Sequence, residues 1–246
     1  MKSRVEKIAL GILVLIVLAV LNAMFGNPVS KALAERGADK VIAEKYGDLD
    51  LSREKVIYNF KDGDYVAHLK VKNSVDPRFE LCFDSFGRLY RDSYEERIFQ
   101  TLMRFDRAIH DYGRGLEKAY DFPYQITLSS WDKIDPAEDL TVDQSVDMKH
   151  LPFKLQAQIY GVGKEATAEE AMDLLQTLQK IMDDEELDVA AYAIDLVPEK
   201  NRDDKGVVQT WEDMFSAYEV PAGVVRRGDV DALEALAKKQ MTEGKD

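Results

Sequence analysis

The sequence predicts an α+β protein that begins with a single transmembrane helix, and three observations lead to this fold class. An uninterrupted apolar run occupies residues 8–25, strand-like alternation follows between residues 56 and 90, and helical spacing returns over residues 93–120. The expected parts are a cytoplasmic N-terminus (1–7), a transmembrane anchor (8–25), a helix with an antiparallel meander (26–92), a long connecting helix (93–120) and a second small α/β sandwich domain (121–246).

The apolar run IALGILVLIVLAVLNAMF is long enough to cross a bilayer, because about 18 helical residues can span its hydrocarbon core. A cleaved secretory signal is the main alternative, since it also combines basic residues with an apolar core. Cleavage needs small residues at two positions just after the core, and the candidate pairs there are Leu21/Ala23, Asn22/Met24 and Ala23/Phe25. An uncleaved anchor is therefore favoured. A buried soluble helix is disfavoured because the run lacks a polar face.

Charges beside the run predict its orientation. Lys2, Arg4 and Lys7 oppose the single acid Glu6, and basic residues mark the cytoplasmic side of a transmembrane helix. We therefore expect a single-pass cell-membrane protein with its N-terminus inside and the bulk of the chain extracytoplasmic. Lipid attachment is excluded, because the only cysteine, Cys82, lies far beyond the run.

The composition restricts the partners of the part outside the membrane. The formal net charge of the chain is −13, and residues 1–7 carry +2, which leaves −15 on the rest. Such a surface repels phosphate backbones, so nucleic acid is not an expected partner. A single cysteine forms no internal disulfide, and the extracytoplasmic part must be stable through its hydrophobic cores alone.

A helix and a meander are expected after the anchor. Asn27 and Pro28 favour a helix start, because the Asn oxygen can cap free N–H groups and Pro fits the first helical position. Helical spacing then continues to Gly47. Alternation and turn residues predict strands at 56–60, 65–71, 79–83 and 89–90, with turns at 61–64 and 85–87. Such a sheet has one solvated face and one face packed on the helix.

The run NPVSKALAERGADKVIAEKYGDLDLSREKVIYNFKDGDYVAHLKV, placed directly after an anchor, resembles the YfjL-like proteins of Firmicutes. The matching features are Gly-Asn-Pro at residues 26–28, Tyr-Gly-Asp-Leu-Asp at 46–50 and Tyr-Asn-Phe-Lys-Asp-Gly-Asp-Tyr at 58–65. The resemblance implies a membrane-anchored protein whose first extracytoplasmic domain is a cystatin-like or PepSY-like α+β unit, with a second domain after it. It implies fold and location, and it carries no catalytic motif.

The next segment is expected to be a long helix that joins and braces the two domains; a partner-binding helix is the alternative. Asp92 and Glu95 resemble a capping box, although Ser or Thr is the usual cap. Gly113 and Gly115 each weaken a helix by about 1 kcal/mol relative to Ala, so a break or kink near residue 113 is expected. The apolar stripe consists of Tyr94, Ile98, Leu102, Phe105, Ile109, Tyr112, Leu116 and Tyr120.

The second domain is expected to contain strands at 124–129, 154–160 and 187–197, the last of them central. Thr167 and Glu170 form a capping box for a helix between the second and third strands. Asp229 is expected to cap a last helix. The segment from Val207 to Tyr218 has no clear assignment.

Two motifs with known chemistry are assigned no role. Residues 52–55 have the S-x-x-K form, in which a lysine one helical turn away takes the serine proton, but they adjoin a strand and the companion motifs are missing. His68, His110 and His150 fall on a strand, a helix and a loop, without zinc-ligand spacing. His68 is expected on the solvated side of its strand.

The remaining candidates also yield no site. Cys82 has no resolving cysteine and is expected to be an unreactive thiol. Residues 48–52 begin like a calcium loop, but Arg53 replaces its glycine and Asn59 its closing glutamate. The acidic connection 132–147 is expected to be solvated, with a weak cation site as the alternative. No catalytic, cofactor-binding or metal-binding residue is therefore predicted.

These observations favour a membrane-tethered, non-catalytic binding or regulatory module that docks a protein or a cell-envelope component outside the membrane. The alternative is an extracytoplasmic enzyme, hydrolase-like, whose residues meet only in the folded chain. Such a site would need a pocket between the two domains, lined by residues such as His110, His150 and nearby carboxylates.

Overall fold

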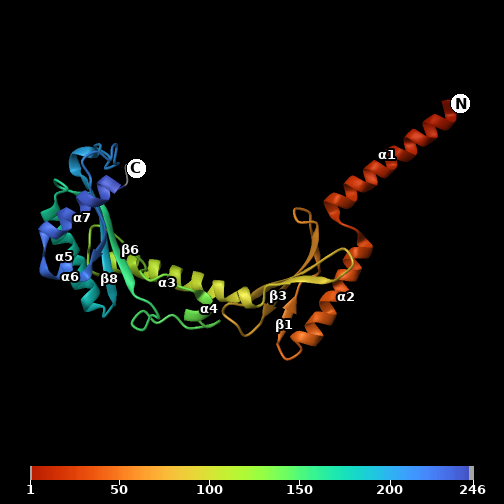
Figure 1. Ribbon diagram of the computed structural model, residues 1–246, viewed down its shortest axis with the longest axis horizontal. Coiled ribbons are helices and arrows are strands. Elements are labelled where there is room, and N and C mark those ends of the chain that lie inside the picture. The colour runs from red at the N-terminus through yellow and green to blue at the C-terminus, as the bar shows by residue number, and fades with distance from the viewer. Residues whose placement is uncertain (1, 244–246) are drawn as a thin grey trace. The chain divides into compact units, whose positions relative to one another are not determined.

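The computed structural model describes residues 2–243, and Figure 1 shows the course of the chain. The protein is a mixed α+β chain with a long apolar helix at its N-terminus and two largely antiparallel sheets. It divides into two compact units, Met1–Thr101 and Leu102–Asp246. Each unit is described by itself.

Helix α1 (Lys2–Phe25) contains the apolar run. Its large apolar side chains are exposed, from Leu21 at 45% to Phe25 at 70%. Within the described residues, this part of the chain holds the one helix that is long and apolar enough to cross a membrane. Length and composition are compatible with a single-pass anchor and with a signal sequence.

Helix α2 (Pro28–Lys45) begins where the sequence predicts. The side-chain oxygen of Asn27 accepts a hydrogen bond from the Val29 N–H at 2.8 Å, and Pro28 occupies the first helical position. Gly26, with φ at +73°, turns the chain between α1 and α2. Hence no flexible linker separates the apolar helix from the first folded domain.

The first sheet is antiparallel throughout and follows α2. It consists of β1 (Leu51–Arg53), β2 (Ile57–Asn59), β3 (Asp64–Val71), β4 (Arg78–Phe83) and β5 (Leu89–Asp92). Strand order is β1-β3-β4-β5, and β2 pairs with the start of β3. The predicted strands are all present, and β1 is an additional one.

One predicted strand is shorter than expected, because the chain turns after Asn59. The Asn59 side chain accepts a hydrogen bond from the Lys61 N–H, and its carbonyl accepts one from the Gly63 N–H. Phe60 therefore lies in the turn, where it is 66% exposed, and not in the core of the sheet.

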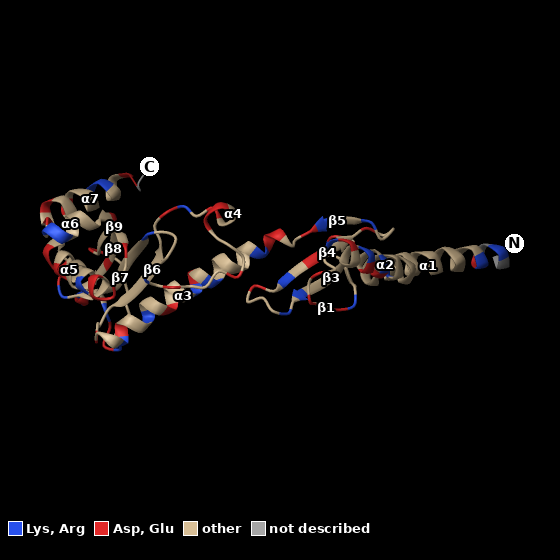
Figure 2. Ribbon diagram, turned by 90° about the horizontal axis from the view of Figure 1, so that it is seen from below, with Lys and Arg blue, Asp and Glu red and all other residues tan. Residues whose placement is uncertain are grey.

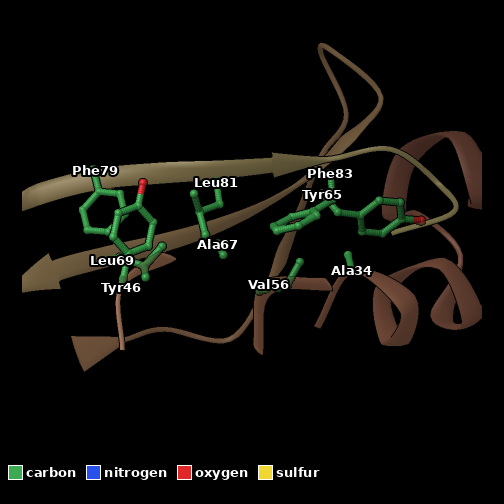
Figure 3. Packing of buried hydrophobic residues seen from close by; sticks show 10 residues of the cluster. Ala34, Tyr46, Val56, Tyr65, Ala67, Leu69, Phe79, Leu81 and Phe83 are labelled. Carbon is green, nitrogen blue, oxygen red and sulfur yellow. The ribbon is translucent and has the colours of Figure 1, made fainter. Parts of the chain in front are cut away.

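The core of the first domain lies between α2 and one face of its sheet (Figure 3). Ala34 and Ala38 are fully buried on the helix, and their small side chains let it approach the strands closely. The facing residues of β3 and β4 are Tyr65, Ala67, Leu69, Phe79, Leu81 and Phe83. Because side chains alternate along a strand, the residues between them, among them His68 and Glu80, lie on the other face. As predicted, one face of the sheet is packed and the other is open.

Helix α3 (Ile98–Ala119) begins later than residue 93, after a 3-10 turn, η1 (Glu95–Arg97). The expected capping box is wrong, because Asp92 is still part of β5, where its side chain accepts a hydrogen bond from the Tyr94 N–H. The expected break near residue 113 is also wrong. A Cβ at Gly113 would lie 3.1 Å from the Ile126 carbonyl oxygen, so this glycine permits close approach to a strand without interrupting α3.

The second domain contains a four-stranded sheet in the order β6-β7-β8-β9. Its strands are β6 (Gln125–Ser130), β7 (Leu155–Gly163), β8 (Val189–Pro198) and β9 (Phe215–Pro221). Strands β7 and β8 are parallel and joined through α5 (Ala168–Asp184), whereas both outer pairs are antiparallel. The three predicted strands are confirmed, and β9 occupies the end of the unassigned segment. The other elements are α4 (Pro136–Asp139), η2 (Glu199–Asn201), α6 (Ala222–Arg227) and α7 (Val230–Glu243).

Burial alternates along β7 and shows which face of the second sheet is covered. Leu155, Ala157 and Ile159 are buried, whereas Gln156 and Gln158 between them are partly exposed. Helices α5, α6 and α7 pack against strands of this sheet (Figure 1). The second domain therefore also has a packed face and an open face.

Side-chain caps begin two helices of the second domain at the predicted residues. Thr167 accepts a hydrogen bond from the Glu170 N–H, and Asp229 accepts one from the Ala232 N–H. The reciprocal half of the predicted capping box is different. The Glu170 carboxylate accepts hydrogen bonds from the N–H groups of residues 164, 165 and 166, so it holds the loop before the helix.

Candidate functional site

A groove of about 600 Å³ lies on the open face of the first sheet. Side chains of neighbouring strands form it, so its shape is fixed by the hydrogen-bonded ladder beneath. Charged residues of both signs dominate its lining. Figure 2 shows blue and red segments along β3 and β4, the strands that carry several of them. Its lining consists of Glu54, His68, Leu69, Lys70, Arg78, Phe79, Glu80, Arg91, Ser93, Glu96 and Gln100.

A histidine and a carboxylate contact each other across two strands of the groove. His68 on β3 and Glu80 on β4 are direct partners in the antiparallel register, and His68 Nδ1 lies 3.0 Å from Glu80 Oε1. The Glu80 backbone N–H also donates to Ser93 Oγ at 2.8 Å, which fixes this part of β4. The floor is therefore an organised polar surface.

The next register pair along the same strands brings two cations together. Lys70 and Arg78 are direct cross-strand partners, and like charges in this arrangement repel. The Lys70 ammonium has one carboxylate nearby, Glu54, with the charged atoms 3.8 Å apart. The Arg78 guanidinium has no ion-pair partner among residues 2–243. This end of the groove therefore carries positive charge that the protein itself does not neutralise.

Side chains of β5 and of the segment after it also line the groove. Arg91 donates to Glu96 at 2.7 Å, and this hydrogen bond together with the carboxylate charge raises the pKa of the Arg91 guanidinium. Gln100 on α3 holds the exposed edge of β4: its oxygen accepts the Arg78 N–H at 3.2 Å, and its amide nitrogen donates to the Arg78 carbonyl. The Gln100 side chain thus replaces a neighbouring strand, and we call this double hydrogen bond the Gln100 clasp.

Cys82 lies on the same face of the sheet as the groove, but it is buried and does not line the groove. It pairs with Val66 in the register, and both are buried on the side of the sheet away from α2. Burial, followed by the negative charge of Asp64, raises the pKa of the Cys82 thiol to about 11. Because the thiolate is the reactive form, these surroundings keep the sulfur unreactive at neutral pH.

The predicted S-x-x-K geometry is not formed. Ser52 lies on β1 as the register partner of Lys70, so the motif runs along a strand and its lysine is not one helical turn away. The stretch that begins like a calcium loop is also part of this strand pairing. Its Asp50 carboxylate lies 2.7 Å from the Lys72 ammonium, and the Lys72 N–H donates to the Asp50 carbonyl.

The three histidines each contact a carboxylate in their own neighbourhood, and the structure does not bring His68 into contact with the others. His110 Nδ1 lies 3.6 Å from Asp111, on exposed positions of α3. His150 Nδ1 lies 2.8 Å from Asp147 in an exposed loop. That hydrogen bond lowers the pKa of the Asp147 carboxyl group. His68 is the one of the three that lines the groove.

Several carboxylates of the acidic connection 132–147 stabilise turns in the backbone. Asp135 caps the short helix α4 through the Ala137 N–H, and Asp139 accepts the Asp135 N–H. Asp132 accepts the Lys154 N–H. Within residues 2–243, no three His, Cys, Asp or Glu side chains gather in a way that would hold a metal ion.

The open face of the second sheet differs from the groove in its chemistry. Apart from Asp195, its polar side chains are uncharged: Gln125, Thr127, Ser129, Gln156, Gln158, Tyr160, Ser216 and Tyr218. Asp195 accepts hydrogen bonds from Gln158 at 2.9 Å, from Ser216 at 2.6 Å and from the Tyr218 hydroxyl at 2.6 Å. Its charge is therefore solvated by side chains of the same face.

The opposed cations of the groove, Lys70 and Arg78, were missed by sequence reasoning, because their pairing depends on the length of the turn between the two strands. In the structure, residues 72–76 close this hairpin, so counting outward from that turn pairs residue 71 with 77 and residue 70 with 78. Such a count places Lys70 opposite Arg78 and His68 opposite Glu80. The net charge of the whole chain did not indicate this cationic pair, because acidic residues are unevenly distributed. Residues 1–101 contain 16 Lys and Arg and 15 Asp and Glu, whereas residues 102–246 contain 17 Lys and Arg and 31 Asp and Glu.

Comparison with protein families identifies the first domain. Residues 1–92 match the family model described as the YfjL-like, N-terminal domain. The matched region ends at Asp92, the last residue of β5. Neither the curated proteins nor the solved structures contain a match to this chain.

Proposed function

Residues 1–92 of this chain are a YfjL-like N-terminal domain, and from this premise we propose that the protein is a membrane-tethered binding module outside the cell. In this proposal α1 anchors the chain in the cell membrane with its N-terminus inside. The groove on the first sheet binds an anionic group on a protein or cell-envelope component. Function then depends on docking at the outer membrane surface, without catalysis by this chain.

The tether is supported by α1 and by the charges around it. The helix is exposed along its apolar length, which is unfavourable in water and favourable in lipid. The basic residues before it favour the cytoplasmic side. An alkaline phosphatase fusion placed after Gly26 is expected to be active, because the enzyme folds outside the cytoplasm. An inactive fusion would contradict the proposed orientation.

The single observation that carries the binding role is the pairing of Lys70 with Arg78. Two adjacent cations with one carboxylate at 3.8 Å leave positive charge in a preformed groove. A bound carboxylate or phosphate would relieve the repulsion between the two side chains and accept hydrogen bonds from the guanidinium. The rest of the groove then contacts groups adjacent to that anion.

Photo-cross-linking in intact membranes tests this role. A photo-reactive amino acid is placed at Glu54 in the full-length protein, and partners are recovered after irradiation. Arg78→Glu is expected to reduce the recovered partner about tenfold or more, because it replaces attraction for an anion by repulsion. Arg36→Glu, on an exposed position of α2, is the matched control and is expected to have no effect.

The same variant separates binding from folding. The carboxylate that Arg78→Glu introduces would face Lys70 across the strands as an opposite charge, so this variant should be at least as stable as the parent. Two outcomes contradict the proposal: no partner enriched over an anchor-only control, or equal recovery from the Arg36→Glu and Arg78→Glu proteins. Loss of partner together with loss of folding would contradict the predicted cross-strand pair.

A further inference from the structure

The chain leaves α1 at a point that is fixed to the first sheet. Asn27, directly after the turn at Gly26, donates its backbone N–H to the Tyr65 hydroxyl at 2.7 Å, and that hydroxyl lies 3.2 Å from the Asn27 carbonyl oxygen. Tyr65 itself is 2% exposed, so its position is fixed by the core. Gly26 contacts the Tyr58 ring so closely that a Cβ would lie 2.6 Å from it.

Two loops of the sheet lie beside this point. The β2–β3 turn directly precedes β3, whose second residue is Tyr65. The β4–β5 turn follows Phe83, the register partner of Tyr65. Gly87 in that turn packs against α2, where a Cβ would lie 2.5 Å from the Leu33 carbonyl oxygen. Figure 3 shows Tyr65 and Phe83 together at one end of the core, near α2, with Tyr46 and Phe79 at the other end.

Both loops present an exposed aromatic ring with a basic residue close by. Phe60 in the β2–β3 turn is 66% exposed and is followed by Lys61. Phe86 in the β4–β5 turn is 72% exposed, and the Arg88 guanidinium lies over its ring at 5.2 Å from the centroid. Val29, in the first turn of α2, is 67% exposed at the same end.

Phenylalanine side chains on an apolar surface, combined with Lys and Arg, are typical of protein segments that lie at the boundary between hydrocarbon and lipid headgroups. The ring enters the apolar layer, while the charged end of Lys or Arg stays among the headgroups. In water, by contrast, two exposed phenylalanine rings leave most of their apolar surface in contact with solvent. The loops at this end therefore match the surface of the membrane that α1 is proposed to cross.

We propose that the β2–β3 and β4–β5 turns insert into the outer leaflet of that membrane, with Phe60 and Phe86 as the inserted side chains. This contact holds the first domain against the membrane surface. The binding partner of these two turns is the lipid bilayer itself. The inference rests on the proposed membrane tether, because it requires α1 to leave the bilayer at Gly26. It adds a second, loop-mediated contact that holds the domain in a fixed orientation.

Lipid quenching of site-specific fluorescence tests the proposal. Full-length protein with Cys82→Ala is reconstituted into phosphatidylcholine vesicles that contain a minority of phosphatidylglycerol. A single cysteine at Asp62, Ser85 or Val75 is labelled with an environment-sensitive dye, and lipids that carry a nitroxide near the headgroup act as quenchers. Val75 is the matched control: it is 65% exposed in the β3–β4 turn, about 25 Å away at the opposite end of β3.

The expected result is loss of emission at positions 62 and 85 and none at position 75. The double substitution Phe60→Ser with Phe86→Ser should remove the quenching at 62 and 85 while the protein still floats with the vesicles. Equal emission at all three positions in protein that floats would overturn the inference and leave the tether standing. Protein that does not float with the vesicles would overturn the tether, and the inference with it.

Discussion

The two sheets of this protein have the same layer plan but expose different chemistry. Each packs one face on helices and leaves the other open. The open face of the first sheet carries a groove with cations and carboxylates, including the opposed pair Lys70 and Arg78. The open face of the second carries amides and hydroxyl groups around the carboxylate of Asp195. Side chains on the open face, and not the layer plan, therefore decide what each domain can bind.

The distribution of charge sharpens this contrast. The acidic excess of the chain belongs to residues 102–246, and residues 1–101 are close to neutral. Yet the open face of the acidic domain is almost uncharged, and the groove with the opposed cations Lys70 and Arg78 belongs to the neutral domain. The net charge of the whole chain therefore describes neither open face. Electrostatic attraction of an anionic group to the groove is compatible with a protein of net charge −13.

The largest expected effect concerns Cys82, which is buried on the same face of the first sheet as the groove. At pH 8 its reaction with a thiol reagent should be about 100-fold or more slower in the folded protein than in urea, because burial suppresses the thiolate. The rate should keep rising with pH towards the raised pKa of about 11. Ser85→Cys in a Cys82→Ala background is the exposed control. Equal reaction rates for the two thiols would show that Cys82 is accessible to the reagent in the folded protein.

Stabilisation of the folded protein by Cys82 follows the same pKa. A thiol with a raised pKa favours the protonated form in the folded state, so its contribution is complete below the ordinary thiol pKa and is lost as pH rises towards about 11. Unfolding monitored across alkaline pH should therefore show a smaller decline for Cys82→Ala than for the parent. An identical decline would contradict the assigned pKa.

The next effect compares one carboxylate on each open face. Asp195→Ala removes the acceptor of three hydrogen bonds and should destabilise the second sheet by about 1–3 kcal/mol. Glu80→Ala removes a partly exposed pair with His68 and should cost less than about 1 kcal/mol. Hydrogen exchange of the full-length protein in detergent micelles reports each sheet separately. Equal destabilisation by the two substitutions would contradict the predicted energetic difference between the two open faces.

A smaller effect is expected at a feature that the two domains share. Gln240 on α7 holds the edge of β9, donating to the Tyr218 carbonyl at 2.7 Å and accepting its N–H at 2.9 Å, as Gln100 does for Arg78. Gln100→Ala and Gln240→Ala should each cost about 1 kcal/mol, since both hydrogen bonds lie near solvent. Faster exchange of the Arg78 and Tyr218 amides checks this. An unchanged exchange rate at these amides would show that water replaces the glutamine hydrogen bonds without loss of stability.

The smallest effect concerns two glycines of α3. Gly115→Ala should stabilise the protein by about 0.5–1 kcal/mol, because nothing lies within 4 Å of the new methyl group and alanine favours the helix. Gly113→Ala should gain less or lose stability, because its methyl group would meet the Ile126 carbonyl oxygen and the Leu128 side chain at 3.1 Å. Chemical denaturation in micelles compares them. A larger gain at Gly113 would contradict its packing role.

Sequence patterns predicted the elements whose signals are local. The cap at Asn27 and Pro28, the hairpin strands and the Thr167 cap need only neighbouring residues, and all are present. The break near Gly113 was wrong because a glycine that weakens an isolated helix here makes room for β6, a contact that only the folded domain contains. The groove was missed for a similar reason. Its charged side chains come from β3, β4, β5, η1 and the residue after β1, and their meeting depends on strand register.

The Gln100 and Gln240 clasps also affect how neighbouring copies of the protein meet. An uncovered strand edge offers free N–H and C=O groups that can pair with a strand of another molecule. Copies attached to one membrane would share a plane, so their edges would meet far more often than in dilute solution. A glutamine that occupies both backbone groups of the edge residue leaves no template there. If the proposed tether holds the protein at a membrane, each clasp would therefore oppose edge-to-edge pairing between neighbouring copies.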